Sequence, residues 1–198
     1  MDVSESVDSR SSLKFSKANE SLTGTCQVKV NGRDNEVVID EQTAIGSLSV
    51  NIHGNNNVIQ VAGRNFLGHV KLFIRGHNSR IVIGSDSNLR SFSAAIGEGN
   101  SSISIGNECL FSIGIEIRTH DSHKIIALDS NERINSPESV VIGDRVWVGQ
   151  DVLVLKGSQI GTDSVVGVRS VVTSTIPSNS VAVGVPARVV RSGIRWSK

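Results

Sequence analysis

Residues 140–173 read VVIGDRVWVGQDVLVLKGSQIGTDSVVGVRSVVT, and aliphatic side chains recur in this stretch at every sixth position. The register begins at Ile142 and continues through Val148, Val154, Ile160, Val166 and Val172. Glycine follows four of these residues, and a second register of small or branched residues holds Val146, Val152, Ser158, Ser164 and Ser170. A short fixed period of this kind indicates a solenoid, in which each turn buries its apolar side chains by stacking on its neighbours.

The first half of the chain repeats on a longer period, marked by Val30, Ile52, Ile74 and Ile96 at a constant interval. Its four copies are VNGRDNEVVI (30–39), IHGNNNVIQV (52–61), IRGHNSRIVI (74–83) and IGEGNSSISI (96–105). The alternating aliphatics at the end of each copy favour a β-strand. The glycines and asparagines supply the positive φ angles that a tight corner needs. We therefore predict β-coils stacked at about 4.8 Å per turn.

The composition fits one soluble globular domain of this type. The chain has 198 residues, of which 38% are hydrophobic, 20% are charged and only 4% are aromatic, with no tyrosine. A core of stacked β-branched side chains does not need aromatic residues. Lysine plus arginine (20) nearly balances aspartate plus glutamate (19), so the charge gives no reason to expect nucleic acid or an anionic membrane as partner.

The ends of the chain differ from the repeats. Residues 1–25 are polar and are predicted to form a weakly ordered or capping arm, residues 26–191 the β-helix domain, and residues 192–198 a short tail in which Trp196 is expected to pack. No secretory signal and no run of about 20 apolar residues is present, so a membrane span is not expected. Cys26 and Cys109 lack the spacing of metal ligands. A reduced cysteine pair in a cytoplasmic protein is therefore expected.

Residues 118–137, RTHDSHKIIALDSNERINSP, interrupt both periods, and such a polar excursion from a regular scaffold is where function is usually built. Histidine suits acyl transfer because it can take a proton from an attacking hydroxyl and return one to the leaving group. In an extended segment, residues two apart point the same way. Asp121 could then hold the ring of His123 while His120 points oppositely, although Asp121 could also be a plain turn residue and a loop histidine is often only solvated.

The hexapeptide register, together with VVIGDRVWVGQ, SVVGVRSVVTSTIP and GVPARVV, resembles the left-handed parallel β-helix acyltransferases, firmly over residues 112–191. The resemblance implies an all-β, left-handed parallel β-helix and a homotrimer with active sites between subunits. It also implies acetyl-CoA as the donor. THDSH resembles a Thr-His-x-x-His stretch whose second histidine is the base, followed at a set distance by the tryptophan of VWVG. Here these residues are His123 and Trp147, and His120 is expected to contact the acceptor.

The same resemblance implies a donor groove. Trp147 would lie against the pantetheine arm, or else be a packing residue at a subunit contact. The matching positions that would line the pantetheine channel are Gln150, Val168 and Thr173. Arg188 and Arg191 would hold the CoA phosphates, a role that suits arginine, or else form a solvated basic tail. Many relatives have a small residue at Val168 and a lysine at Ser174, so the detailed phosphate contacts depart from the family pattern.

The function expected from this resemblance is transfer of an acetyl group from acetyl-CoA to a sugar hydroxyl, for a carbohydrate acceptor of a capsule or other surface polysaccharide. Two alternatives remain open: acetylation of an amine or small molecule on the same scaffold, and a non-catalytic solenoid that serves as a binding module. The γ-class carbonic anhydrases share a left-handed β-helix and bind metal through histidines. His53, His69 and His77 would have to reach one metal from distant coils, so we predict no metal site.

Overall fold

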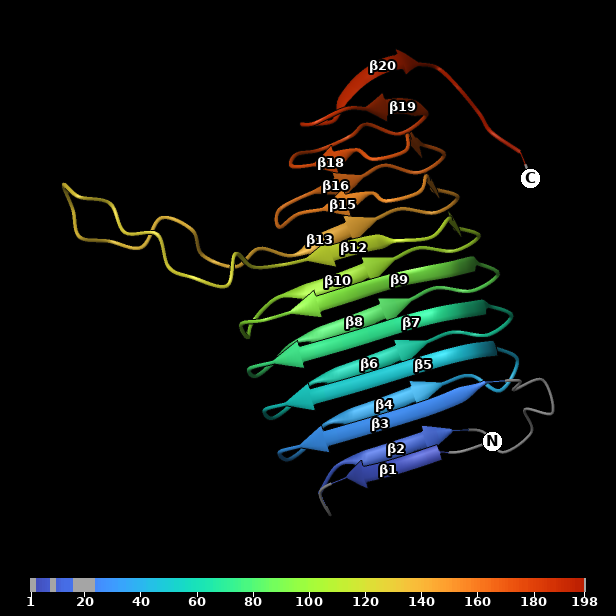
Figure 1. Ribbon diagram of the computed structural model, residues 1–198, viewed down its shortest axis with the longest axis vertical. Coiled ribbons are helices and arrows are strands. Elements are labelled where there is room, and N and C mark those ends of the chain that lie inside the picture. Colours follow the sequence, from blue (N-terminus) through green and yellow to red (C-terminus); the bar gives the residue numbers. More distant parts are fainter. Residues whose placement is uncertain (1–2, 8–9, 16–23, 198) are drawn as a thin grey trace.

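Successive turns of the chain stack in register into a left-handed parallel β-helix of about seven turns (Figure 1). The computed structural model describes residues 3–7, 10–15 and 24–197, and within these ranges the regular structure is entirely β. The predicted fold class is confirmed. None of the described residues forms a helix long and apolar enough to cross a membrane.

The N-terminal turns are flattened, each made of one long and one short strand. The long strands are β3 (Thr25–Asn31), β5 (Ala44–His53), β7 (Phe66–Arg75) and β9 (Asn88–Ile96). The short strands are β4 (Glu36–Ile39), β6 (Val58–Val61), β8 (Arg80–Ile83) and β10 (Ser102–Ile105). The predicted longer period is confirmed, because the sheet register aligns Val30, Ile52, Ile74 and Ile96 in successive turns.

The C-terminal turns have three short sides. Their strands are β11 (Leu110–Phe111), β12 (Ile115–Arg118), β13 (Val140–Ile142), β14 (Trp147–Val148), β15 (Leu153–Val154), β16 (Gln159–Ile160), β17 (Val165–Val166) and β18 (Val171–Val172). Val148 pairs with Val166 and Val154 with Val172, so three hexapeptides make one turn. β19 (Ser180–Val183) and the antiparallel β20 (Arg188–Ser192) end the stack.

Columns of aliphatic side chains fill the interior. Both sets of positions that recur every sixth residue in the sequence lie inside it. Among the described residues, most buried polar side chains lie where the corners turn. There the Asn57 amide donates to Asn35 Oδ1 at 3.0 Å and to Gly76 O at 3.0 Å. Its own Oδ1 accepts the Ser79 N–H at 3.0 Å. Because these buried amides are paired, they fix the corners at little energetic cost.

The described parts of the N-terminal arm extend the stack. β1 (Val3–Val7) pairs with β3, and β2 (Ser12–Phe15) pairs with β4. Residues 1, 2, 8, 9 and 16–23 of the expected arm lie outside the described residues, as does Lys198 of the expected tail. Cys26 and Cys109 are buried and form no disulfide.

The excursion leaves the stack between β12 and β13 and projects to one side (Figure 1). The excursion adds residues between one turn and the next but does not shift the pairing of the strands. Leu110 pairs with Trp147 across the excursion, just as Trp147 pairs with Val165 in the next turn, which has no excursion. The Glu138 N–H donates to Thr119 O at 3.0 Å and closes the base. The stacked register therefore continues above and below as though the excursion were absent.

Candidate functional site

Three corners define each C-terminal turn, and each predicted site residue is located by its corner. Residues 143–146, 161–164 and 177–179 form the first corner. Residues 149–152, 167–170 and 184–187 form the second. The excursion, residues 155–158 and residues 173–176 share the third corner.

His120 lies at the start of the excursion against the preceding turn. The Gly97 N–H donates to its Nδ1 at 3.1 Å, and the ring covers Gly97 so closely that a Cβ there would meet His120 Nε2 at 2.0 Å. Burial lowers the pKa of His120, against the opposing effect of Glu98. Because Nδ1 accepts, the neutral imidazole carries its proton on Nε2. His120 is therefore placed as a hydrogen-bond donor.

Asp121 does not hold the His123 ring in this structure. Its Oδ2 accepts from Lys156 Nζ at 2.6 Å and from Asn135 Nδ2 at 3.0 Å. The Lys156 hydrogen bond is the largest cause that lowers the pKa of Asp121. The His123 side chain is exposed, and within the described part of the chain no hydrogen bond reaches its imidazole. The carboxylate is therefore paired with Lys156 and Asn135, and the structure does not bring it to the His123 ring.

Asn135 links Asp121 to His123 instead. Its amide, in a residue only 5% exposed, also donates to the backbone oxygen of His123 at 2.8 Å. Its Oδ1 accepts the Ile125 N–H at 2.7 Å and Arg133 Nε at 3.2 Å. One side chain thus fixes the backbone at His123 and Ile125 and also binds the Asp121 carboxylate. Sequence reasoning missed Asn135 because a single asparagine in a polar stretch carries no periodic signal.

A second contact fastens the excursion to the solenoid. Arg133 donates to both carboxylate oxygens of Glu98 at 2.6 and 2.8 Å, and both side chains are partly buried. This two-bond pair is the largest cause that lowers the pKa of Glu98. Bidentate arginine–carboxylate pairs fix direction as well as distance. The base of the excursion is therefore held from the Glu98 side and from the Lys156 side.

The donor-side residues lie elsewhere on the turn. Trp147 is 42% exposed and is the first residue of β14, which forms the face between the first and second corners. It pairs with Val165, which pairs with Val181, which faces Arg191 across the antiparallel strands. The structure thus sets Trp147 and Arg191 along one sheet, about 14 Å apart at the spacing of β-strands.

The remaining donor-side residues divide between two corners. The Arg169 N–H donates to Gln150 O, which stacks Gln150 and Val168 in successive turns at the second corner. Val168 is 62% exposed. Arg188 pairs with Val183 at the end of the stack and is exposed. Thr173 follows β18 at the third corner, so it is the one predicted donor residue on the excursion side.

Trp196, expected only to pack, contacts Trp147. The two indole centroids lie 6.1 Å apart with 50° between the ring planes. In Figure 1 the tail that carries Trp196 descends on the side of the solenoid opposite the excursion. The structure therefore does not bring His123 and Trp147 of one chain together.

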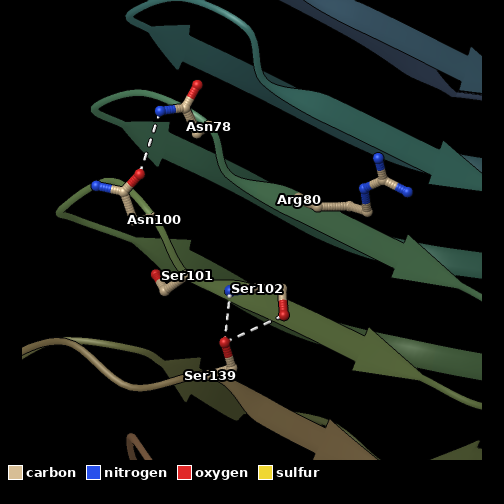
Figure 2. Close-up of a pocket in the computed structure, with 6 residues that line it drawn as sticks. All are labelled: Asn78, Arg80, Asn100, Ser101, Ser102 and Ser139. Atoms are coloured by element: carbon tan, nitrogen blue, oxygen red, sulfur yellow. Dashed lines mark hydrogen bonds between the residues drawn. The ribbon is translucent and has the colours of Figure 1, made fainter.

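A polar groove of about 470 Å³ lies at the foot of the excursion (Figure 2). Its lining residues are Asn78, Arg80, Asn100, Ser101, Ser102 and Ser139. Ser139 follows the excursion directly and accepts the Ser102 N–H at 3.0 Å. Arg80 is exposed, and within the described residues its guanidinium has no ion pair or hydrogen bond; Figure 2 shows it at the edge of the groove, directed away from the three serines. Sequence reasoning missed this groove, because its residues come from three turns.

The repeat-turn histidines follow the corners of the N-terminal half. Asn55 donates its N–H to His77 Nδ1 at 3.1 Å, and His53 Nδ1 lies 3.2 Å from the Asn31 amide. Within the described ranges, no group of three or more His, Cys, Asp and Glu side chains is arranged to hold a metal ion. The prediction of no metal site stays a prediction.

No family model matches the chain. Over 96 residues it is 30% identical to the polysialic acid O-acetyltransferase of Escherichia coli O1:K1 / APEC, a match that covers 48% of this chain and 31% of that protein. Over 91 residues it is 36% identical to the galactoside O-acetyltransferase of Escherichia coli strain K12, covering 45% of this chain and 43% of that protein. The chain spans less than half of the length of these two curated relatives.

The fold comparison extends over the whole chain. The crystallographic structure of the polysialic acid O-acetyltransferase OatWY superimposes with a TM-score of 0.87 at 27% identity, covering 100% of this chain and 92% of that one. The predicted resemblance to the β-helix acyltransferases, and among them to polysaccharide and sugar O-acetyltransferases, is confirmed.

Replacing Lys156 with glutamine should raise the pKa of Asp121, because the largest cause of its lowered value is removed. A carboxyl with a lowered pKa contributes stability above its unfolded value and loses it as the pH falls through the folded value. Lys156→Gln should therefore make the base of the excursion open at a higher pH than in the wild type. Carboxyl-detected NMR titration gives the pKa, with Lys71→Gln on β7 as the charge-matched control. An unchanged Asp121 titration in Lys156→Gln would refute the pairing.

Proposed function

We propose that this chain is an acetyl-CoA-dependent O-acetyltransferase that acts on a hydroxyl group of a carbohydrate. The observation that carries the proposal is the excursion held by Asn135, Lys156 and Glu98, which presents two histidines on a fold that matches OatWY along its length. The relatives' printed activities, on polysialic acid and on galactosides, support a sugar acceptor.

In the proposed reaction, His123 takes the proton of the acceptor hydroxyl while the hydroxyl oxygen attacks the thioester carbonyl carbon. The tetrahedral intermediate then breaks the carbon–sulfur bond, and the imidazolium returns the proton to the leaving thiolate. The products are an acetyl ester and CoA with a free thiol. A positioned base contributes about 10²–10⁴-fold, and the rest of the acceleration comes from holding the two substrates together.

The other excursion residues have supporting roles in this proposal. His120, with its proton on Nε2, donates to the acceptor oxygen and positions it beside His123. Asp121 acts indirectly: its carboxylate orients Asn135, and the Asn135 amide holds the backbone of His123. Asp121 is thus a positioning residue in this proposal and makes no direct contact with the ring.

The arrangement of one chain supports an active site shared between subunits. His123 lies at the third corner, and Trp147 opens the face beyond the first corner. A cyclic trimer repeats one head-to-tail contact three times. Such a contact can bring the excursion of one chain to the Trp147 face of the next, where Gln150, Val168 and the two arginines of β20 would receive acetyl-CoA.

The groove at the foot of the excursion is proposed as an acceptor subsite. Its hydroxyl and amide groups can exchange hydrogen bonds with sugar hydroxyls, and the Arg80 guanidinium, which has no partner among the described residues, favours a carboxylate. An anionic polysaccharide, such as that of a capsule, offers both. The groove borders the excursion through Ser139, so a bound polymer would lead toward His123.

His123→Ala should lower kcat by about 10²-fold or more with the KM for acetyl-CoA nearly unchanged, because the substitution removes a transition-state role. Asp121→Asn should cost less, since the base is still present. His120→Ala should act mainly on the KM of the acceptor. Steady-state kinetics of the three variants in one buffer test the assignment. A dead His120→Ala enzyme beside an active His123→Ala enzyme would reverse it.

A shared site predicts complementation between two inactive variants. Co-expressed His123→Ala and Trp147→Ala chains should form mixed trimers in which about a quarter of the sites combine an intact His123 with an intact neighbouring Trp147. Activity, measured below the KM for acetyl-CoA, should then exceed that of either variant alone. Light scattering should give three times the 21.1 kDa chain mass. No gain on mixing would place the whole site within one chain.

Arg80→Ala should raise the KM for an anionic polysaccharide about tenfold, the value of one charged hydrogen bond. The KM for acetyl-CoA should not change, and added salt should weaken acceptor binding more in the wild type than in the variant. Arg90→Ala, which removes an exposed arginine of β9, is the control. Equal losses in both variants would mean that only the overall charge matters.

A further inference from the structure

The C-terminal tail, residues 193–197, folds back along the outside of the stack. It follows β20, and Gly193 reverses the chain with a φ of 72°. The Ile194 N–H then donates to Asn179 O at 3.0 Å, while Asn179 Nδ2 donates to Ile194 O at 3.1 Å. Two hydrogen bonds to one residue fix where the tail begins its descent.

The tail then passes three turns at the first corner. Asn179, Asp163 and Arg145 occupy equivalent positions there, each with a positive φ. Asp163 is bonded to Arg145, which is the main reason that its pKa is lowered, and Arg195 of the tail adds to that effect. At the lowest of the three turns Trp196 Nε1 donates to Arg145 O at 2.7 Å. The tail is therefore attached at both of its ends.

This attachment fixes the orientation of the Trp196 ring. Its only polar atom is used by Arg145 O, so the faces of the indole remain for other contacts. One neighbour is Trp147, at 6.1 Å between centroids. These are the only two tryptophans among the 198 residues of the chain. Their contact, between residues far apart in the sequence, creates one aromatic surface beside the face that leads to Arg191.

We propose that Trp196 is a second wall of the donor site, which together with Trp147 holds the pantetheine arm of acetyl-CoA. This inference rests on the proposed function. The pantetheine arm alternates amide groups with short apolar segments. The flat faces of two indole rings offer a large apolar area against which such a chain can pack. The tail does not fill the donor's place, because Trp147 remains 42% exposed with Trp196 in contact.

A cavity next to Trp196 is consistent with a ligand that binds against this residue. A cavity of about 240 Å³ is lined by Glu108, Arg145, Trp196 and Ser197. Arg145 is already paired with Asp163, so its charge is not available for the CoA phosphates. With Arg145 paired and the Glu108 carboxylate also in the lining, the cavity does not favour the anionic phosphates, which are left to the arginines of β20.

The two tryptophans make the test spectroscopic. In Trp147→Phe, which keeps an aromatic ring, Trp196 is the single source of indole fluorescence. Its emission should change on addition of CoA and, at higher concentration, of pantetheine, which lacks the nucleotide. Calorimetry in parallel establishes saturation. An emission spectrum unchanged at saturating CoA would overturn the inference.

The Kd for CoA and pantetheine distinguishes a Trp196 that contacts the donor from one that only packs or that competes with the donor. Trp196→Ala should raise the Kd for both CoA and pantetheine about tenfold. Trp196→Phe, which loses the bond to Arg145 O but keeps a ring, should raise it less. The Tm should stay near the wild-type value, because the tail lies outside the stacked core. An unchanged Kd would mean that Trp196 only packs, and a lower Kd would mean that the tail competes with the donor; either result overturns the inference.

Calorimetry on the wild type tells a failure of this inference from a failure of the proposed function. If the wild type binds no CoA, both the donor assignment and the second wall are wrong. If the wild type and Trp196→Ala bind CoA equally, only the second wall is wrong.

Discussion

The backbone hydrogen bonds between successive turns are the constraint on which the rest of this molecule depends. Each turn must match its neighbours in length and phase, because a slip of one residue would move every inward side chain to the outer face. The inward columns are almost entirely aliphatic. The chain satisfies the constraint with two turn lengths, and the change between them occurs where the long strands give way to three short sides.

A register this strict decides where chemistry can be placed. Additional residues cannot be absorbed within a turn, so they leave at a corner and return to the same corner, as residues 119–138 do. Outside the stack they have no periodic partners and need specific ones. Asn135, the Lys156–Asp121 pair and the Arg133–Glu98 pair provide them. The same polar contacts that hold the excursion in place also fix the backbone of His123.

The corners likewise separate the two halves of the proposed reaction. The excursion occupies the third corner, while Trp147, Arg191 and the returning tail belong to the face and corner on the other side. A rigid solenoid cannot bend to join them. The proposed site shared by neighbouring chains would resolve this separation without distorting either stack, and it would make assembly a condition for activity.

The sequence by itself determined the solenoid, both of its periods, the positive-φ corners and the place of the excursion, because each of these follows from residue type at a fixed spacing. It also singled out His120, His123 and Trp147, through a motif and a distance along the chain. Only the tertiary structure decided which groups meet: Asp121 with Lys156, Asn135 with the backbone of His123, and Trp196 with Trp147. These contacts join residues that are distant in the chain and share no period. They depend on how the excursion closes and how the tail turns back, and a repeat pattern carries no information about either.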